Sequence, residues 1–190
     1  GENGVMQNYF SKHGIPITGC GSKESELTFD KIKCLKFLRN KGVKTAKSIS
    51  VKKNIEIKSK KIQEEIGFPC FIKASKSGSS FGVYKVYNQE EFIDCLNSAF
   101  EIDDKILVET FIEGREFSIG VLTYKNKVTV LPITEIIASN DFFDYEAKYE
   151  GKSQEITPAK IDDKLKDKLN KISKDIYNII GLKGFSRSEF

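Results

Sequence analysis

Apolar residues at helical spacing predict that much of the chain is α-helical. In the clearest case leucine or isoleucine returns every three or four residues, up to a glycine that can end the helix. Elsewhere an asparagine followed three residues later by a glutamate forms a capping-box pattern, which marks a helix start. The helices predicted in this way span residues 5–10, 29–38, 57–66, 88–100 and 165–179.

Short apolar or alternating segments between these helices predict β-strands. Two of them flank Tyr124-Lys-Asn-Lys, a polar sequence typical of a hairpin, and a hairpin joins antiparallel strands. Because helices and strands interleave but the hairpin favours an antiparallel sheet, the predicted fold class is mixed α+β. Strands are predicted over 43–51, 70–74, 83–87, 106–109, 116–123, 128–133 and 185–190, with 15–19 extended.

Composition limits the classes of protein that the chain can represent. Its 190 residues allow one or two domains, and 39% hydrophobic residues is ordinary for a globular chain. We expect no membrane span and no signal peptide, and four reduced cysteines in a cytoplasmic protein. The net charge is +4, yet only three of the 31 basic residues are arginines, which weakens a nucleic-acid-binding interpretation.

A loop of small residues, 75–82, lies between two predicted strands. Successive backbone N–H groups in such a loop can face one concavity, which suits a phosphate group. It is not a Walker A loop, because no Gly-Lys-Ser/Thr opens a helix. Lys73 on the preceding strand adds a positive charge, although an ordinary flexible hairpin with a surface lysine is the alternative.

Two further segments carry candidate chemistry. Residues 109–116 join two strands, and Ile112 there could contact a purine ring while Glu116 accepts ribose hydroxyls; a plain charged turn is the alternative. Arg187 and Glu189 alternate on one face of the last strand, where they could bind an anion and a metal. A surface ion pair is the alternative for these two.

The most informative stretch is 141–149, with four aromatic residues, three carboxylates and one lysine. It follows a strand-like segment and precedes a polar run, so we expect a loop, and loops on rigid scaffolds concentrate binding and catalysis. The edge of an amphipathic strand is the alternative interpretation.

Taken together, these motifs resemble the sequences of D-alanine–D-alanine ligases. That family belongs to the ATP-grasp superfamily, in which ATP lies between two α+β subdomains. The resemblance covers essentially the whole chain and rests on Gly1-Glu-Asn-Gly, Gly14-Ile-Pro-Ile-Thr-Gly, Asp30-Lys31, Phe68-Pro69 with Lys73, Gly78-Ser-Ser-Phe-Gly, Gly114-Arg-Glu, Phe143-Asp-Tyr-Glu-Ala-Lys-Tyr and Arg187-Ser-Glu.

The resemblance implies a division of the chain into three parts. Residues 1–29 would be a remnant of an N-terminal α/β substrate-binding domain. Residues 30–112 would form the central ATP-grasp subdomain, and 113–190 an incomplete C-terminal one with a lid loop at 139–155.

The resemblance also implies an ATP site. Lys31, Lys73 and Lys148 would contact the phosphates, and the loop 78–82, with Ser79 and Ser80, would close over them. Three lysines with Mg²⁺, or Mn²⁺ in its place, suit phosphoryl transfer, which depends on positioning and charge neutralisation.

The other nucleotide contacts are implied in the same way. Glu109, Thr110 and Ile112 match the segment that contacts adenine, and Glu116 matches the carboxylate that binds ribose. Glu189 matches a magnesium-ligand position, although the family usually has aspartate there.

The implied catalytic residues are Glu2, Ser79, Tyr149 and Arg187. Glu2 would hold the ammonium of the first D-alanine, with Ser79 and Tyr149 as its hydrogen-bond partners, and Tyr149 would favour D-alanine over D-lactate as acceptor. Arg187 would stabilise the acyl phosphate and the tetrahedral oxyanion.

The implied reaction is ATP-dependent ligation of two D-alanines through an acyl phosphate, for peptidoglycan precursor synthesis, in a protein that is a homodimer when complete. The family's N-terminal strand, its Glu-x-Asn magnesium pair and a glycine loop have no counterpart in this sequence, so we expect a fragment that catalyses poorly by itself. The alternatives are another ATP-grasp carboxylate–amine ligase and a non-catalytic, lysine-rich nucleotide- or nucleic-acid-binding fragment.

Overall fold

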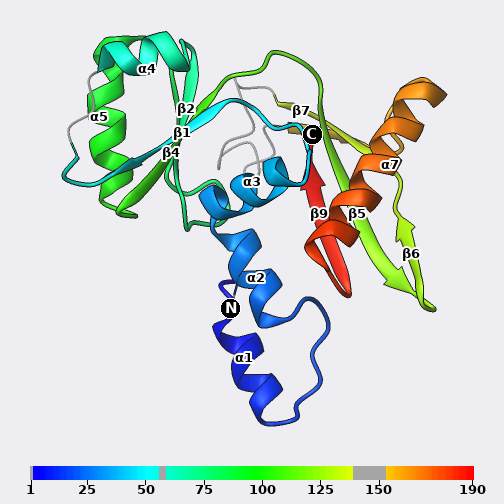
Figure 1. Ribbon diagram of the computed structural model, residues 1–190. Coiled ribbons are helices and arrows are strands. Elements are labelled where there is room, and N and C mark those ends of the chain that lie inside the picture. The colour runs from blue at the N-terminus through cyan, green and yellow to red at the C-terminus, as the bar shows by residue number, and fades with distance from the viewer. Residues whose placement is uncertain (1, 56–58, 139–152) are drawn as a thin grey trace. The chain divides into compact units, whose positions relative to one another are not determined.

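The chain forms two compact units, each built on an antiparallel sheet (Figure 1). The computed structural model describes residues 2–55, 59–138 and 153–190. One unit is Thr28–Glu113, and the other combines Gly1–Leu27 with Gly114–Phe190. Antiparallel sheets packed with helices confirm the predicted α+β class, whereas the three-part division of the chain stays a prediction. No helix in the described ranges is long and apolar enough to cross a membrane.

The Thr28–Glu113 unit has a four-stranded sheet in the order β1-β4-β2-β3. Two helices, α4 and α5, lie on one side of it (Figure 1), and α3 precedes the first strand. The elements are α3 (Lys31–Asn40), β1 (Ser48–Lys52), α4 (Ser59–Glu65), β2 (Cys70–Ala74), β3 (Val83–Val86), α5 (Gln89–Phe100) and β4 (Lys105–Thr110).

Strand alternation gives this sheet two different faces. Ile72 lies opposite Val108 in the register, and both are completely buried in the core that α4 and α5 cover. The neighbouring positions point the other way. Phe71 on β2 pairs with Glu109 on β4 and with Lys85 on β3, and these three side chains are only partly buried. Leu107 lies on the same side but is buried, where it faces α3. We call the part of this second surface with Phe71, Lys85 and Glu109 the open face of the first sheet.

Local signals explain where α5 begins. The Asn88 side chain accepts the Glu91 N–H at 3.0 Å, and the Glu91 carboxylate accepts the Tyr87 N–H at 3.1 Å. This reciprocal pair satisfies N–H groups at the start of the helix. The predicted helix start at Asn88 is confirmed, with the Glu91 carboxylate accepting the Tyr87 N–H in place of the Asn88 N–H of a standard capping box.

The second unit has β5 at its centre. β9 pairs along one edge of β5, and β6 and β7 pair in turn along the other, with β8 outside β7 (Figure 1). The predicted hairpin joins β5 to β6 through Lys125 and Asn126, whose φ values of 47° and 62° fit a type I′ turn. The elements are α1 (Val5–Lys12), α2 (Ser22–Phe29), β5 (Glu116–Tyr124), β6 (Lys127–Val130), β7 (Thr134–Ala138), β8 (Ser153–Ile156), α7 (Asp163–Ile180) and β9 (Phe185–Glu189).

Helix α7 covers one face of this second sheet. The Asp162 side chain caps its start by accepting the Leu165 N–H at 2.8 Å, and Gly181, at φ 79°, ends it. Leu169 packs in the core with strand residues, and the Tyr177 hydroxyl donates to a backbone carbonyl at 2.9 Å. Among the described residues of this unit no helix contacts the opposite surface as α7 contacts this one, and we call that surface the open face of the second sheet.

Several predicted boundaries were wrong. The helix predicted to start at Phe29 begins at Lys31, because Asp30 caps it and Phe29 ends the separate helix α2. The strand predicted over 43–51 begins only at Ser48, since its partner β4 pairs with 48–52 alone. The stretch 15–19 forms no regular strand, and residues 153–155 of the predicted lid belong to β8.

Candidate functional site

The open face of the first sheet carries a tight ion pair. Lys73 Nζ lies 2.5 Å from Glu109 Oε2, and the side chains are 25% and 12% exposed. Lys73 also lies over the Phe71 ring, 5.0 Å from its centre. The two residues are 36 apart in sequence but share this face because β2 and β4 pair. The lysine predicted to contact phosphate is therefore held by the glutamate of the predicted adenine segment.

Beside this pair lies an aromatic group that sequence reasoning missed. Lys85 Nζ sits 4.3 Å from the centre of the Phe111 ring, and that ring lies 6.0 Å from the ring of Phe71. Flat apolar surface beside paired charges suits a heteroaromatic ring with polar edges. The signal was present in the sequence: alternate positions of the predicted strand 70–74 give Phe71 and Lys73 one face.

The end of β4 is partly committed to structural hydrogen bonds. Thr110 Oγ1 donates to the Ile66 carbonyl at 3.1 Å, and the Thr110 N–H donates to Lys47 O at 2.9 Å. Ile112, by contrast, is 66% exposed. Of the two, Ile112 is thus the side chain that can make a new apolar contact.

The start of the Ser75–Gly82 loop is tied to α3. The Lys31 ammonium donates to Ser77 O at 2.8 Å, to Ala74 O at 3.0 Å and to Ser77 Oγ at 3.2 Å. These bonds put its positive charge at the loop, as a phosphate-binding role requires. The Lys76 N–H donates to Asp103 Oδ2 at 2.7 Å, which fastens the same end of the loop from another side.

The middle of the loop adopts a conformation that serine rarely takes. Ser79 and Ser80 have φ values of 50° and 58°, and the Phe81 N–H closes the turn on Gly78 O at 2.9 Å. Left-handed backbone costs a non-glycine residue about 1 kcal/mol. Strain of this kind concentrates at sites that bind ligands.

Asp30 is a buried carboxylate at the junction of α3 and the loop, with 2% of its surface exposed. Burial raises the pKa of Asp30, but hydrogen bonds from the Lys33 N–H and the Ser75 hydroxyl, with the charges of Lys33 and Lys76, lower it below its ordinary 3.8. The group is therefore a carboxylate at neutral pH. The sequence motif Asp30-Lys31 does not indicate this role for the residue.

The open face of the second sheet brings three predicted residues to one surface. Glu116 and Ser118 alternate on β5, and β9 places Glu189 opposite Ser118 and Arg187 opposite Gly120. Side chains two apart on paired strands share a face. Arg187 Nη2 lies 3.3 Å from Glu189 Oε1, and the two side chains are 66% and 43% exposed.

The other face of the same sheet holds a different arginine–glutamate pair. Arg115 donates to both oxygens of Glu135, at 2.6 and 2.8 Å, and to the Lys160 carbonyl at 2.9 Å. The hydrogen bond from Arg115 lowers the pKa of Glu135 below its ordinary value of 4.5. Because this pair also fastens the chain segment ahead of α7, its role is structural.

The metal-ligand prediction rests on Glu189. Within residues 2–55, 59–138 and 153–190 no three His, Cys, Asp or Glu side chains form a group that could hold a metal. Glu189 nevertheless offers an exposed carboxylate, and Mg²⁺ commonly binds one or two carboxylates together with substrate phosphates. The donor chemistry fits a single protein contact to Mg²⁺ from this residue.

The remaining predicted site residues are Glu2, Lys148 and Tyr149. Glu2 is exposed in the turn before α1. Lys148 and Tyr149 lie outside the described residues, as does most of the predicted lid.

The cysteines are poor candidates for a nucleophile. All four are free. Burial raises the pKa of Cys70 to about 11 and also raises the pKa values of Cys34 and Cys95. Since the thiolate is the reactive form, these three thiols are unreactive at neutral pH.

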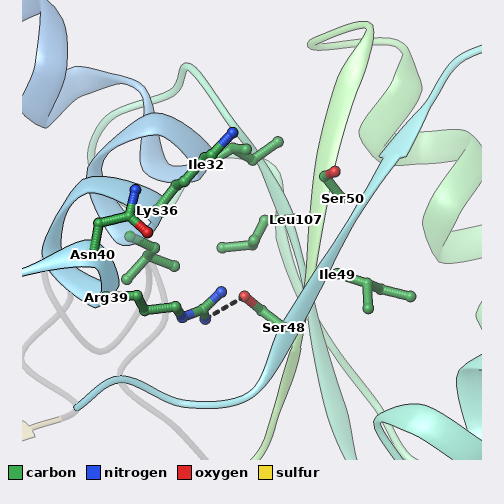
Figure 2. A pocket seen from close by; sticks show the side chains of 9 residues that line it. Ile32, Lys36, Arg39, Asn40, Ser48, Ile49, Ser50 and Leu107 are labelled. Atoms are coloured by element: carbon green, nitrogen blue, oxygen red, sulfur yellow. Dashed lines mark hydrogen bonds between the residues drawn. The ribbon is translucent and has the colours of Figure 1, made fainter. Parts of the chain in front are cut away.

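A cavity of about 220 Å³ lies between α3 and β1 (Figure 2). Leu107 lines it from the sheet, and the Arg39 guanidinium donates to the Ser48 hydroxyl at 2.6 Å beside it. It is smaller than most ligand sites, and none of the predicted site residues lines it. We interpret it as a packing gap behind the helix.

Solved structures define the class of protein. The chain resembles the crystal structure of the VanG D-Ala:D-Ser ligase from Enterococcus faecalis, with a TM-score of 0.86 and 34% identity over 99% of this chain and 55% of that one. It also resembles a D-alanine–D-alanine ligase from Bacillus anthracis, with a TM-score of 0.85, 31% identity, and 99% and 60% of the two chains covered. The fold is that of an ATP-grasp protein.

Sequence relatives define the family. A family model described as "D-ala D-ala ligase C-terminus" matches residues 37–190. D-alanine–D-alanine ligases from Flavobacterium johnsoniae and Christiangramia forsetii are each 49% identical to the chain over all 190 residues. The chain belongs to the D-alanine–D-alanine ligase family. It spans 59% of the length of the first relative and 58% of the second.

Proposed function

We propose that the full-length protein ligates two D-alanines to D-alanyl-D-alanine at the expense of ATP. The observation that carries this proposal is the family membership of the chain, together with charged residues on the open face of each sheet.

The first sheet would bind the nucleotide. Phe71, Lys85 and Phe111 offer ring faces and positive charge, and Ile112 offers an exposed apolar side chain for adenine. Glu109 lies on this surface, and Thr110 follows it at the end of β4, although the Thr110 side chain points to the other face, where its Oγ1 donates to the Ile66 carbonyl.

The phosphates would lie at the Ser75–Gly82 loop. Lys31 is already bonded to that loop, and Lys73 shares a sheet face with the residues assigned to adenine. Bound phosphate would compete with Glu109 for the Lys73 ammonium. Ser79 and Ser80 would cover the phosphates through the strained turn, and Lys148 would add charge at the reacting end.

The second sheet would bind the ribose and the reacting groups. Glu116 is assigned to the ribose hydroxyls, and Arg187 to the oxygens on which negative charge develops. An exposed guanidinium 3.3 Å from its nearest carboxylate can turn toward an anion at little cost. Glu189 would hold Mg²⁺, or Mn²⁺ in its place, and the ion would neutralise phosphate charge.

The chemistry proceeds in two steps. The carboxylate of one D-alanine attacks the terminal phosphorus of ATP, so that an acyl phosphate forms and ADP leaves. The amine of a second D-alanine then attacks the acyl carbon, loses a proton and expels phosphate. Arg187 stabilises the oxyanion of the second step.

The substrate contacts follow the family pattern. Glu2 would hold the ammonium of the first D-alanine with Ser79 and Tyr149 as partners, and Tyr149 would favour D-alanine as the acceptor. Closure of 139–155 would exclude water from the acyl phosphate. The proposal includes a cytoplasmic homodimer that synthesises peptidoglycan precursors, for which family membership is the support.

One structural likeness favours a second candidate. The E. faecalis protein, with 34% identity, is a D-Ala:D-Ser ligase. D-serine is therefore an alternative acceptor at the same site, and the family relation alone does not choose between the two.

The test is release of phosphate from ATP by the full-length protein. D-alanine alone should stimulate it and yield D-alanyl-D-alanine by mass spectrometry. Stimulation that requires added D-serine would favour the second candidate. If neither amino acid stimulates release while other amine–carboxylate pairs do, another ATP-grasp activity replaces both.

A further inference from the structure

Asp30 joins two elements that the proposed nucleotide site depends on. Its Oδ1 accepts the Lys33 N–H at 3.0 Å, which is an ordinary helix cap. The same atom accepts the Ser75 hydroxyl at 2.9 Å, across 45 residues, at the first position of the Ser75–Gly82 loop. Both Asp30 and Ser75 are buried.

The first turn of α3 is occupied in holding the loop. The Lys31 N–H donates to Ser75 O at 3.0 Å, and the Ile32 N–H lies 3.4 Å from Ser75 Oγ. Free N–H groups at a helix start would attract an anion. Here Ser75 and Asp30 accept hydrogen bonds from the first three N–H groups of the helix. This helix end therefore fixes the loop instead of binding phosphate.

This junction determines where the Lys31 charge lies. The Lys31 backbone is fixed against Ser75, and its ammonium meets three oxygens of Ala74 and Ser77. If Ser75 separated from Asp30, the loop would move relative to the base of the Lys31 side chain. Loss of the junction would then disturb the alignment between the Lys31 ammonium and the loop.

We propose that Asp30, acting through Ser75, is a positioning residue that holds Lys31 and the Ser75–Gly82 loop in the geometry that binds the phosphates of ATP. The inference rests on the proposed nucleotide-binding function. Asp30 makes no contact with ATP in this role; it reduces the freedom that binding would otherwise have to remove. The effect should appear in the affinity for ATP and in KM for ATP, with kcat little changed.

Four single variants of the full-length protein separate this role from simple helix capping. Ser75→Ala removes the side-chain bonds of the junction, to Asp30 and from the Ile32 N–H, and leaves the helix cap and the backbone bond from Lys31. Asp30→Ala removes the cap as well as the bond to Ser75. Asp30→Asn keeps an oxygen for both bonds. Asp162→Ala is the matched control, since Asp162 caps α7 with an equivalent bond of 2.8 Å to Leu165 N–H.

Titration calorimetry with ATP and Mg²⁺, without D-alanine, gives the main result. Ser75→Ala and Asp30→Ala should weaken ATP binding about fivefold, the value of one hydrogen bond near 1 kcal/mol. Asp30→Asn and Asp162→Ala should stay within about twofold of the unsubstituted protein. Amide hydrogen exchange should be faster over 76–82 in Ser75→Ala and unchanged in Asp162→Ala.

Unchanged ATP affinity in Ser75→Ala, or equal weakening in Asp162→Ala, would overturn the proposal. Ser75→Ala decides the matter even where Asp30→Ala fails to fold. If the unsubstituted protein binds ATP but D-alanine stimulates no turnover, the ligase function fails while the affinity series still tests Asp30. If it binds no ATP, both fail.

Discussion

The two faces of the second sheet each carry an arginine paired with a glutamate, and the pairs differ in almost every respect. On the helix-covered face Arg115 donates hydrogen bonds to both oxygens of Glu135 and to a backbone carbonyl. On the open face Arg187 makes a single contact of 3.3 Å to Glu189, and its side chain is 66% exposed against 48% for Arg115. Residue types alone would have treated the two pairs alike.

The difference indicates which arginine is available for chemistry. A guanidinium with a bidentate partner and a carbonyl has its donors committed, so it stabilises structure. One with a single long contact can reorient toward an anion. Both arginines lie in motifs of the family resemblance, Gly114-Arg-Glu and Arg187-Ser-Glu, and their surroundings separate them.

Replacement of Arg187 should have the largest effect on the rate of the reaction. Replacing it with lysine should lower kcat of the full-length protein by roughly 10²–10³-fold, because a preorganised donor to the developing oxyanion is lost. Thermal unfolding should stay at the same temperature, since this exposed pair contributes little to stability. A kcat within a factor of about three of the unsubstituted value would remove the catalytic role.

Arg115 should show the reverse pattern. Arg115→Ala leaves Glu135, whose side chain is 10% exposed, without its bidentate partner. The urea midpoint should fall clearly while kcat per folded molecule is retained. Lys171→Ala, which breaks an exposed pair with Asp175, is the control and should shift the midpoint less. Equal shifts in the two variants would contradict a structural role for Arg115.

The same pair predicts a dependence of stability on pH. The pKa of Glu135 is lowered in the folded protein, so its contribution is present above its ordinary pKa of 4.5 and is lost as pH falls through the folded value. The free energy of unfolding should fall below about pH 4.5 less steeply in Glu135→Gln than in the unsubstituted protein. The pKa of Asp30 is also lowered, so Asp30 contributes to the pH dependence with the same sign. This contribution should be present in Glu135→Gln as well as in the unsubstituted protein. Parallel pH curves would show that the pair does not titrate with folding.

The smallest expected effect is at Glu189. The family usually has aspartate at this position, and either carboxylate is a suitable oxygen ligand for Mg²⁺. Glu189→Asp should therefore change the Mg²⁺ concentration for half-maximal activity by roughly threefold or less. Glu189→Gln, which removes the charge, should change it more. If both variants matched the unsubstituted protein, Glu189 would not be a ligand.

Local sequence signals predicted the elements whose ends carry recognisable caps or turns. The start of α5 at Asn88–Glu91 and the end of α7 at Gly181 are examples. Strand β8, a polar Ser-Gln-Glu-Ile segment, was missed because its pairing with β7 comes from tertiary contact and not from an apolar pattern.

The candidate site was predictable by residue type but not by partner. Lys73 was identified from its strand, yet its pairing with Glu109 depends on β4 lying next to β2, which no local pattern indicates. The role of Asp30 was missed for the same reason, since Ser75 is 45 residues away.

The most direct test of the account is ATP-dependent formation of D-alanyl-D-alanine by the full-length protein, measured by mass spectrometry beside Arg187→Lys and Arg115→Lys. We expect the dipeptide from the unsubstituted protein and from Arg115→Lys at comparable rates, and at least about 100-fold less from Arg187→Lys. No dipeptide from the unsubstituted protein, or an equal loss of rate in the two arginine variants, would contradict the assignment of catalysis to the open face of the second sheet.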